Sequence, residues 1–173
     1  MATQSKVAGN FANQAAVLIT ESAANTQTSS KFAFPFSIMD KMGLIISRIE
    51  YFFNSPGVLD SANDSTVLGL TIASTVTDLT SAADPLIIDT CNMQRIDTGT
   101  AASASLIIKP YSKDLSQLPG GGILVAPNPL YGMIKSSGAS GAAAGWVRLF
   151  YTYIEMQPDE YWALVESRRI ITS

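Results

Sequence analysis

The stretch that decides the fold runs from Trp146 to Met156 and reads WVRLFYTYIEM. Tryptophan, valine, leucine, phenylalanine, tyrosine and isoleucine dominate it, and such residues favour a pleated, packed setting. The stretch therefore predicts a long β-strand, and it makes a sheet the starting point for interpreting the rest of the chain.

Two segments upstream show the period-two alternation of a strand with one buried face. From Lys31, the side chains of Phe32, Phe34, Phe36 and Ile38 share a face, and Pro35 places this strand at an edge or a bulge because proline cannot donate to a ladder. From Gly43 to Phe53, residues 45, 49, 51 and 53 are expected on one face and residues 44, 46, 48, 50 and 52 on the other.

Further strands are expected between clusters of Pro, Gly, Asn, Asp and Ser, which form sheet connections. They are Thr66–Ala73, Leu86–Thr90 with a continuation to Ile96, Ala104–Lys109, Ile123–Ala126 and Leu130–Lys135. Eight strands with little helix predict an all-β fold, either a sandwich or a barrel.

The segment Pro158–Arg169 is the helix that the sequence predicts. Acidic residues lie in its first turn and arginines in its last, which complements the helix dipole. Tyr161, Trp162 and Val165 provide apolar contacts, and we expect the Trp162 side to dock on the sheet or on a neighbouring subunit.

Residues 1–30 are rich in Ala, Asn, Gln, Ser and Thr, with a short apolar patch at Val17, Leu18 and Ile19. This composition predicts an N-terminal arm, followed by one domain over residues 31–173. The arm is either a disordered tail or an extended segment that orders against a neighbouring subunit, with the patch as its anchor.

Composition favours an assembly subunit. In 173 residues, 47% are hydrophobic and 14% are charged, well below the roughly 25% charged residues of an ordinary soluble domain. We therefore expect part of the surface to lie against other protein. The net charge is −3 and the basic residues are scattered, so no direct nucleic-acid binding is expected.

The N-terminal residues lack the basic flank and apolar core of a secretory signal, so we expect synthesis in a cytoplasm. No stretch reaches the roughly eighteen uninterrupted apolar residues of a membrane helix. Cys91, the single cysteine, is expected to be a buried thiol.

Catalytic equipment is missing from the sequence. The chain has no histidine, which removes Ser-His-Asp and Cys-His arrangements and nearly all zinc sites, and no lysine follows a serine at the Ser-x-x-Lys spacing. The loop Gly138–Ala142 departs from a nucleophile elbow at Ala142, and Asp60–Asp64 departs from a calcium loop, so both are interpreted as turns. Glu50 and Glu155 are the remaining candidate carboxylates, and they are interpreted as solvated strand residues. No enzyme, cofactor or metal site is predicted.

The strand pattern over residues 31–156, the uncharged arm and the low charge resemble the single jelly-roll coat proteins of tailless icosahedral viruses. The resemblance implies an eight-stranded jelly-roll sandwich that assembles with copies of itself into a shell of a virion and is made in the host cytoplasm. It implies other capsid proteins and the surface of an internal membrane as further partners, because the basic arm of many such coats is missing here. The expected contact residues are Val17, Leu18, Ile19, Pro35, Tyr161, Trp162 and Val165.

Two alternatives stay open. One is another virion or phage component, such as a spike, decoration or tail protein. The other is a carbohydrate-binding module that stacks sugars on Trp146, Trp162 or tyrosine side chains.

Overall fold

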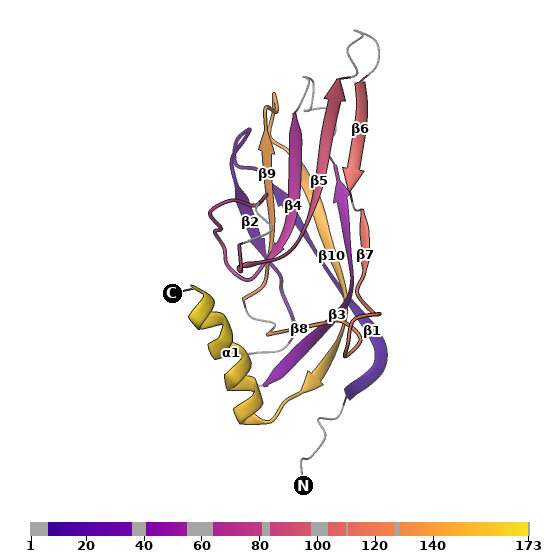
Figure 1. Ribbon diagram of the computed structural model, residues 1–173, viewed down its shortest axis with the longest axis vertical. Helices are drawn as coiled ribbons and strands as arrows, with labels where there is room; N and C mark the ends of the chain where they lie inside the picture. The colour runs from indigo at the N-terminus through magenta and orange to yellow at the C-terminus, as the bar shows by residue number, and fades with distance from the viewer. Residues whose placement is uncertain are drawn as a thin grey trace.

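The computed structural model describes residues 7–35, 41–54, 64–80, 84–97, 104–109, 111–126 and 129–172. Within these residues the chain forms ten strands and one helix (Figure 1). They are β1 (Val7–Thr20), β2 (Thr28–Lys31), β3 (Met42–Phe53), β4 (Ser65–Thr71), β5 (Ile87–Asp97), β6 (Ala104–Lys109), β7 (Ser112–Asp114), β8 (Ile123–Val125), β9 (Tyr131–Ser137), β10 (Ala144–Glu155) and α1 (Pro158–Thr172).

The first sheet, sheet A, is arranged around β10. Its order is β1-β10-β3-β7, with β8 also paired to β3, and every pair is antiparallel. Val147 on β10 lies opposite Val17 on β1 and Tyr51 on β3. The strand predicted over 146–156 is thereby confirmed, with bounds of 144–155.

The second sheet, sheet B, has the order β2-β9-β4-β5-β6 and is also antiparallel throughout. Its strands β4, β5, β6 and β9 confirm the strands predicted around residues 66–73, 86–96, 104–109 and 130–135. In β4 the buried run extends from Thr66 to Thr71, so both faces of this strand are covered.

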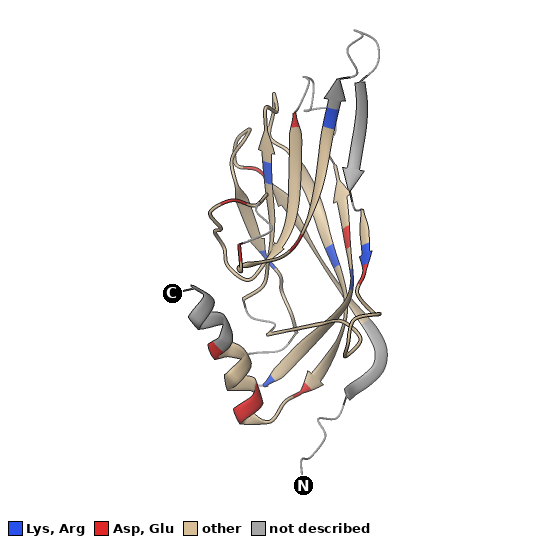
Figure 2. Ribbon diagram, in the orientation of Figure 1, with Lys and Arg blue, Asp and Glu red and all other residues tan. Residues whose placement is uncertain are grey.

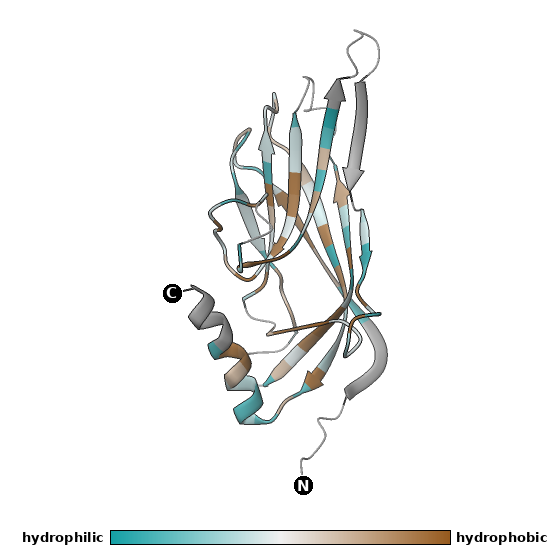
Figure 3. Cartoon of the chain, in the orientation of Figure 1, coloured by the Kyte–Doolittle hydropathy of each residue, from teal (hydrophilic) through white to brown (hydrophobic). Residues whose placement is uncertain are grey.

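The core lies between the two sheets. Ile19, Ile49, Tyr51, Val147 and Leu149 enter it from sheet A, and Leu68, Leu70, Cys91 and Ile134 enter it from sheet B. Figure 3 shows apolar segments on β3, β10 and β4. The predicted all-β class is confirmed, and the two packed antiparallel sheets form a β-sandwich.

The prediction of an arm over residues 1–30 does not hold for Val7–Thr20, which form β1 and pair with β10 of the same chain. Ile19 is fully buried, whereas its neighbour Leu18 is exposed, as expected of a strand with one buried face. Just after the strand, the buried Glu21 carboxylate accepts hydrogen bonds from the Ser136 hydroxyl at 2.6 Å and the Ala143 N–H at 2.9 Å. These charge-assisted bonds tie the end of β1 into the sandwich.

The strand predicted from Lys31 to Ile38 is also corrected. β2 ends at Lys31, and residues 32–35 follow it outside any strand. Phe32 is nevertheless buried, and its N–H donates to the Leu130 carbonyl at 2.9 Å. Residues 36–40 lie outside the described part of the chain. Phe32 and Phe34 therefore pack on the core just after β2, outside the strand.

A bulge at Ser47 changes which residues of β3 point inward. Arg48 lies opposite Phe150 and Ile46 lies opposite Tyr151, so Ser47 is the extra residue. Before the bulge the inward side chains are Leu44 and Ile46, and after it they are Ile49 and Tyr51. The prediction that Ile45 and Ile49 share a face is therefore wrong, since it assumed one unbroken alternation.

Helix α1 confirms the predicted helix, with bounds Pro158–Thr172. The Gln157 N–H donates to the Glu160 carboxylate at 3.2 Å, which satisfies one of the free donors at the start of the helix. Tyr161 is fully buried, whereas 53% of Trp162 is exposed. The tyrosine side of the helix, and not the predicted Trp162 side, is thus the side that packs on this chain.

Candidate interaction surface

The outer face of sheet A, on the side away from the core, carries three bands of side chains. An apolar row lies across one end and contains Leu18, Trp146, Phe52 and Tyr111. A charged band follows, with Arg148, Glu50, Arg48 and Asp114. A second apolar group, Ile45, Leu124 and Ile154, lies beyond it.

Strand register builds the first apolar row. Leu18 lies opposite Trp146, and Trp146 lies opposite Phe52, so side chains from β1, β10 and β3 become neighbours. The Phe52 and Tyr111 rings meet edge to face at a centroid distance of 4.9 Å. Leu18 is 43% exposed and Trp146 is 38% exposed, so the described part of the chain leaves this row open to solvent.

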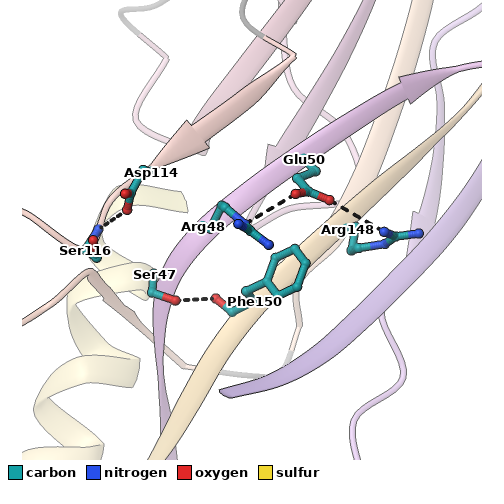
Figure 4. Close-up of polar contacts among 7 residues, drawn as sticks. All are labelled: Ser47, Arg48, Glu50, Asp114, Ser116, Arg148 and Phe150. Carbon is teal, nitrogen blue, oxygen red and sulfur yellow. Dashed lines mark hydrogen bonds and ion pairs between the residues drawn. The ribbon is translucent and has the colours of Figure 1, made fainter. Parts of the chain in front are cut away.

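In the charged band, two arginines each lie over an aromatic ring and are joined through Glu50. Figure 4 shows both ion pairs of Glu50 and the Phe150 ring beside Arg48. Arg48 lies 4.0 Å from the centre of the Phe150 ring and Arg148 lies 4.9 Å from that of Phe52. The Glu50 carboxylate forms ion pairs with both arginines, at 3.3 Å from Arg48 Nε and 3.5 Å from a terminal guanidinium nitrogen of Arg148. The cation–π contacts and the shared carboxylate restrict both guanidinium groups.

Asp114 completes this band on the edge strand β7, where it lies opposite Arg48. Hydrogen bonds from the side chain and backbone of Ser116 hold the pKa of Asp114 below its ordinary value. The carboxylate is therefore charged at neutral pH. Two arginines and two acids make the band electrically balanced, and in the view of Figure 2 charged residues are scattered over the ribbon without a basic stripe.

The outer face of sheet B is covered by its own chain. Val67 on β4 and Met133 on β9 are buried against Val76 and Leu79, which belong to the connection between β4 and β5. A Cβ atom on Gly69 would lie 2.5 Å from the Leu79 side chain, so the connection lies directly on the strand. Of the two outer faces, as far as the structure describes them, sheet A is the one with large apolar side chains left in solvent.

A polar cluster bridges the two sheets inside the sandwich. The Tyr51 hydroxyl of β3 donates to the Asp89 carboxylate of β5 at 2.7 Å, and the Lys113 ammonium of β7 pairs with the same carboxylate. Burial, followed by the Asp89 charge, raises the pKa of Tyr51 well above its ordinary value. Burial also raises the pKa of the Cys91 thiol to about 12, so the thiol is protonated at neutral pH and is a poor nucleophile.

The predicted contact residues do not gather in one place. Leu18 belongs to the outer face of sheet A, whereas Ile19 enters the core and Val17 packs against it. Pro35 is exposed outside the strands, and Tyr161 is buried. Trp162 is exposed on α1, and Val165 is half-buried. Their role as subunit contacts stays a prediction.

The charged band and most of the apolar residues beside it were not predicted from the sequence. Arg48, Glu50 and Arg148 look like ordinary solvated strand residues in the sequence, and only the register of β3 against β10 brings them together. The signal that could have found them is the alternation in Trp146, Arg148 and Phe150, which places these three residues on one face.

The remaining glycine-rich and acidic segments of the sequence either form turns or lie outside the residues that the structure describes. Gly120 and Gly121 have positive φ values in an open turn, and residues 60–63 lie outside the described part of the chain. Among the described residues, no group of three or more His, Cys, Asp or Glu side chains could hold a metal ion. A search of the same residues finds no helix with the length and apolar character needed to span a bilayer.

No protein-family model matches the chain, and no curated protein sequence is detectably similar to it.

Proposed function

We propose that the protein is a structural subunit of a virus shell, a coat protein with a jelly-roll sandwich that assembles with copies of itself. The observation that carries the proposal is the nested pairing of the strands. β1 pairs with β10, β2 with β9, β3 with both β7 and β8, and β4 with β5. A jelly roll is one long antiparallel ribbon folded over on itself, and nested pairs of this kind support that fold.

The distribution of strands between the sheets gives further support. Along the chain, β1 and β3 belong to sheet A and β2 and β4 to sheet B, and on the return β7 and β8 belong to sheet A, β9 to sheet B and β10 to sheet A. The chain thus alternates between sheets as a rolled ribbon does. β6 extends sheet B beyond β5 and lies outside this core of the proposed jelly roll.

The surface favours a structural role for this fold, because jelly rolls also occur in lectins and enzymes. Only 14% of the residues are charged, and apolar side chains lie exposed on the outer face of sheet A and on α1. Such a surface suits contact with other protein. The proposed partners are further copies, other capsid proteins and an internal membrane surface; direct nucleic-acid binding and catalysis are not part of the proposal.

Assembly of the purified protein tests the proposal. We expect a concentration-dependent shift from small species to particles in light scattering and in negative-stain electron micrographs. A protein that stays monomeric across salt concentration and pH, with no particle-sized species, would count against a shell subunit. Discrete three-fold spikes or appendages without a shell would select the alternative of another virion component.

A carbohydrate-binding module is the second candidate, and the exposed Trp146 beside Phe52 and Tyr111 is the observation that favours it. Aromatic faces of this kind stack on sugar rings. A glycan array, followed by titration of tryptophan fluorescence with any hit and comparison with Trp146→Ala, tests it. Absence of binding on the array removes this candidate.

A further inference from the structure

The outer face of sheet A has a pattern that is complementary to itself. Along β10 the outward side chains follow in order as Trp146, Arg148, Phe150 and Thr152, and they define four rows across the sheet. On β3 the same rows contain Phe52, Glu50, Arg48 and Ile45, where the Ser47 bulge keeps Ile45 in phase with Thr152. The order of the β3 side chains across the face is therefore apolar, charged, charged and apolar.

In the arrangement that we consider, the outer faces of sheet A in two copies face each other, related by a two-fold axis. The axis lies between the two sheets, perpendicular to the strands, and passes midway between the row of Glu50 and the row of Arg48. Such an axis keeps each strand over its own counterpart and exchanges the rows. Glu50 of one copy then faces Arg48 of the other, and the reverse pair forms at the same time. Opposite charges meet in both places.

The neighbouring positions match as well. Arg148 would face Phe150 of the second copy, as a cation over an aromatic ring. Ser112 would face Asp114, as a donor to a carboxylate, because both lie on β7 beside Glu50 and Arg48. In the outer rows Phe52 would face Ile45, so an apolar side chain meets an apolar one.

The size of the face fits a dimer. From Trp146 to Ile154 it spans about 27 Å at about 3.4 Å per residue, and its four strand positions at about 4.8 Å give a width of about 19 Å. Each copy would contribute roughly 500 Å² of flat sheet, and the pair roughly 1,000 Å², which is the minimum area of a biological interface and fits a weak dimer. Aligned packing of two sheets about 10 Å apart is a common arrangement.

We propose that the outer face of sheet A binds a second copy of this chain, as a two-fold dimer in which Glu50 pairs with Arg48 of the other copy. The proposal rests on the proposed function, since it names the first contact through which such a subunit self-associates. The occupant is the chain itself because the face is electrically balanced and its charges match under the two-fold exchange.

Charge reversal with a mixing experiment tests the pairing. In a dimer of Arg48→Glu two carboxylates face each other, and in a dimer of Glu50→Arg two guanidinium groups do. Each variant alone should therefore dimerise at least about tenfold more weakly than the wild type. Mixing the two variants in equal amounts removes these like-charge contacts, because one chain then carries acids and the other arginines at both positions. Sedimentation velocity over a dilution series should show two monomeric variants whose mixture is dimeric.

Controls separate association from folding. Circular dichroism must show that each variant is folded. The swapped variant Arg48→Glu with Glu50→Arg should dimerise more tightly than either single variant, because it restores opposite charges between copies, whereas Arg148 and Asp114 then each lie beside a like charge within the copy. Lys135→Glu, a charge reversal on sheet B, is the matched control and should leave dimerisation unchanged. If Arg48→Glu and Glu50→Arg each dimerise as well as the wild type, or if their mixture stays monomeric, the proposal is overturned.

Electron microscopy of the same samples separates this inference from the proposed function. Shells that assemble from Arg48→Glu or Glu50→Arg as well as from the wild type would remove the sheet A dimer and leave the shell subunit in place. A dimer that obeys the charge pattern but never forms larger particles would support the inference and remove the shell.

Discussion

The outer faces of the two sheets differ in whether their apolar side chains are covered by the same chain. Both faces carry apolar side chains, but on sheet B the chain between β4 and β5 folds back and buries Val67 and Met133 beneath Val76 and Leu79. On sheet A no described segment of the same chain does so, and Leu18 and Trp146 keep 43% and 38% of their surface exposed. Covering one face within the chain stabilises the monomer, whereas leaving the other open provides a surface for association.

The difference shows that the composition of a strand does not decide whether a face is buried. β10 is richer in large apolar residues than β4, yet β10 alternates buried and intermediate or exposed residues while β4 is buried along both faces. Whether the outer face of a strand is buried depends on a covering segment, which for β4 is the connection between β4 and β5. Changes on the covered face should therefore affect folding, and changes on the open face should affect association.

Leu79→Ala should have the largest effect, because it removes the fully buried side chain that covers sheet B. We expect the free energy of unfolding to fall by about 2–5 kcal/mol, from lost burial and the cavity left behind. Urea unfolding followed by circular dichroism measures it. Leu118→Ala, at a leucine that is 43% exposed, is the matched control and should change the free energy by about 0.5 kcal/mol or less. Equal losses at the two sites would show that the connection does not cover the sheet.

Gly69→Ala should destabilise the protein by about 1–3 kcal/mol, because a new methyl group would overlap the Leu79 side chain. The double variant Gly69→Ala with Leu79→Ala should lose less than the sum of the two single losses, since the truncated Leu79 leaves room for the methyl group. A double-mutant cycle in urea measures this coupling. Additive losses would place the two residues out of contact.

Tyr51→Phe tests the hydrogen bond that joins the two sheets inside the sandwich. Loss of the hydrogen bond to Asp89 should cost about 1 kcal/mol at neutral pH. The raised pKa of Tyr51 means that the folded protein keeps the phenol proton when the unfolded chain loses it, so its contribution is complete below pH 10 and falls as the pH rises above 10. Phenylalanine has no such proton. Unfolding free energies measured from pH 8 to pH 11 should thus fall less steeply above pH 10 in the variant, by about 1 kcal/mol between pH 10 and pH 11. Parallel curves would contradict the assignment.

The strands that the sequence predicts well are those with a strong and uninterrupted signal. β10 was predicted to within two residues because aromatic and branched side chains dominate the eleven residues from Trp146 to Met156, which leaves no competing interpretation. β1 was missed because Ala, Asn and Gln are weak strand formers, and its place depends on β10 and on the hydrogen bonds of Glu21. Tertiary pairing overrides weak local preference.

The candidate surface could be predicted less well than the fold. The phase change at Ser47 has no sequence signal, and its cause is tertiary: β3 changes partner there from β8 to β7, and the Leu115 N–H donates to the Ser47 carbonyl at 2.7 Å. Without that phase change, Ile45 and Arg48 would not share the outer face. The exposure of Trp162 was missed for a related reason, since the sequence shows an apolar stripe on α1 but not which side finds the sheet.

Leu18→Ala should change the free energy of unfolding of the monomer least. It tests whether the exposed outer face of sheet A serves association. Leu18 and Ile19 are neighbours on β1 with opposite orientations, so they form a matched pair within one strand. Ile19→Ala should cost about 2–5 kcal/mol at any protein concentration, whereas Leu18→Ala at low concentration should cost about 0.5 kcal/mol or less.

Association through sheet A adds a second signature, because a dimer that forms only from folded chains raises the melting temperature as concentration rises. That rise should be present in the wild type and weaker in Leu18→Ala. A wild-type melting temperature that is constant over a wide range of concentration, or a Leu18→Ala loss as large as that of Ile19→Ala, would show that the face of sheet A works for folding and not for association.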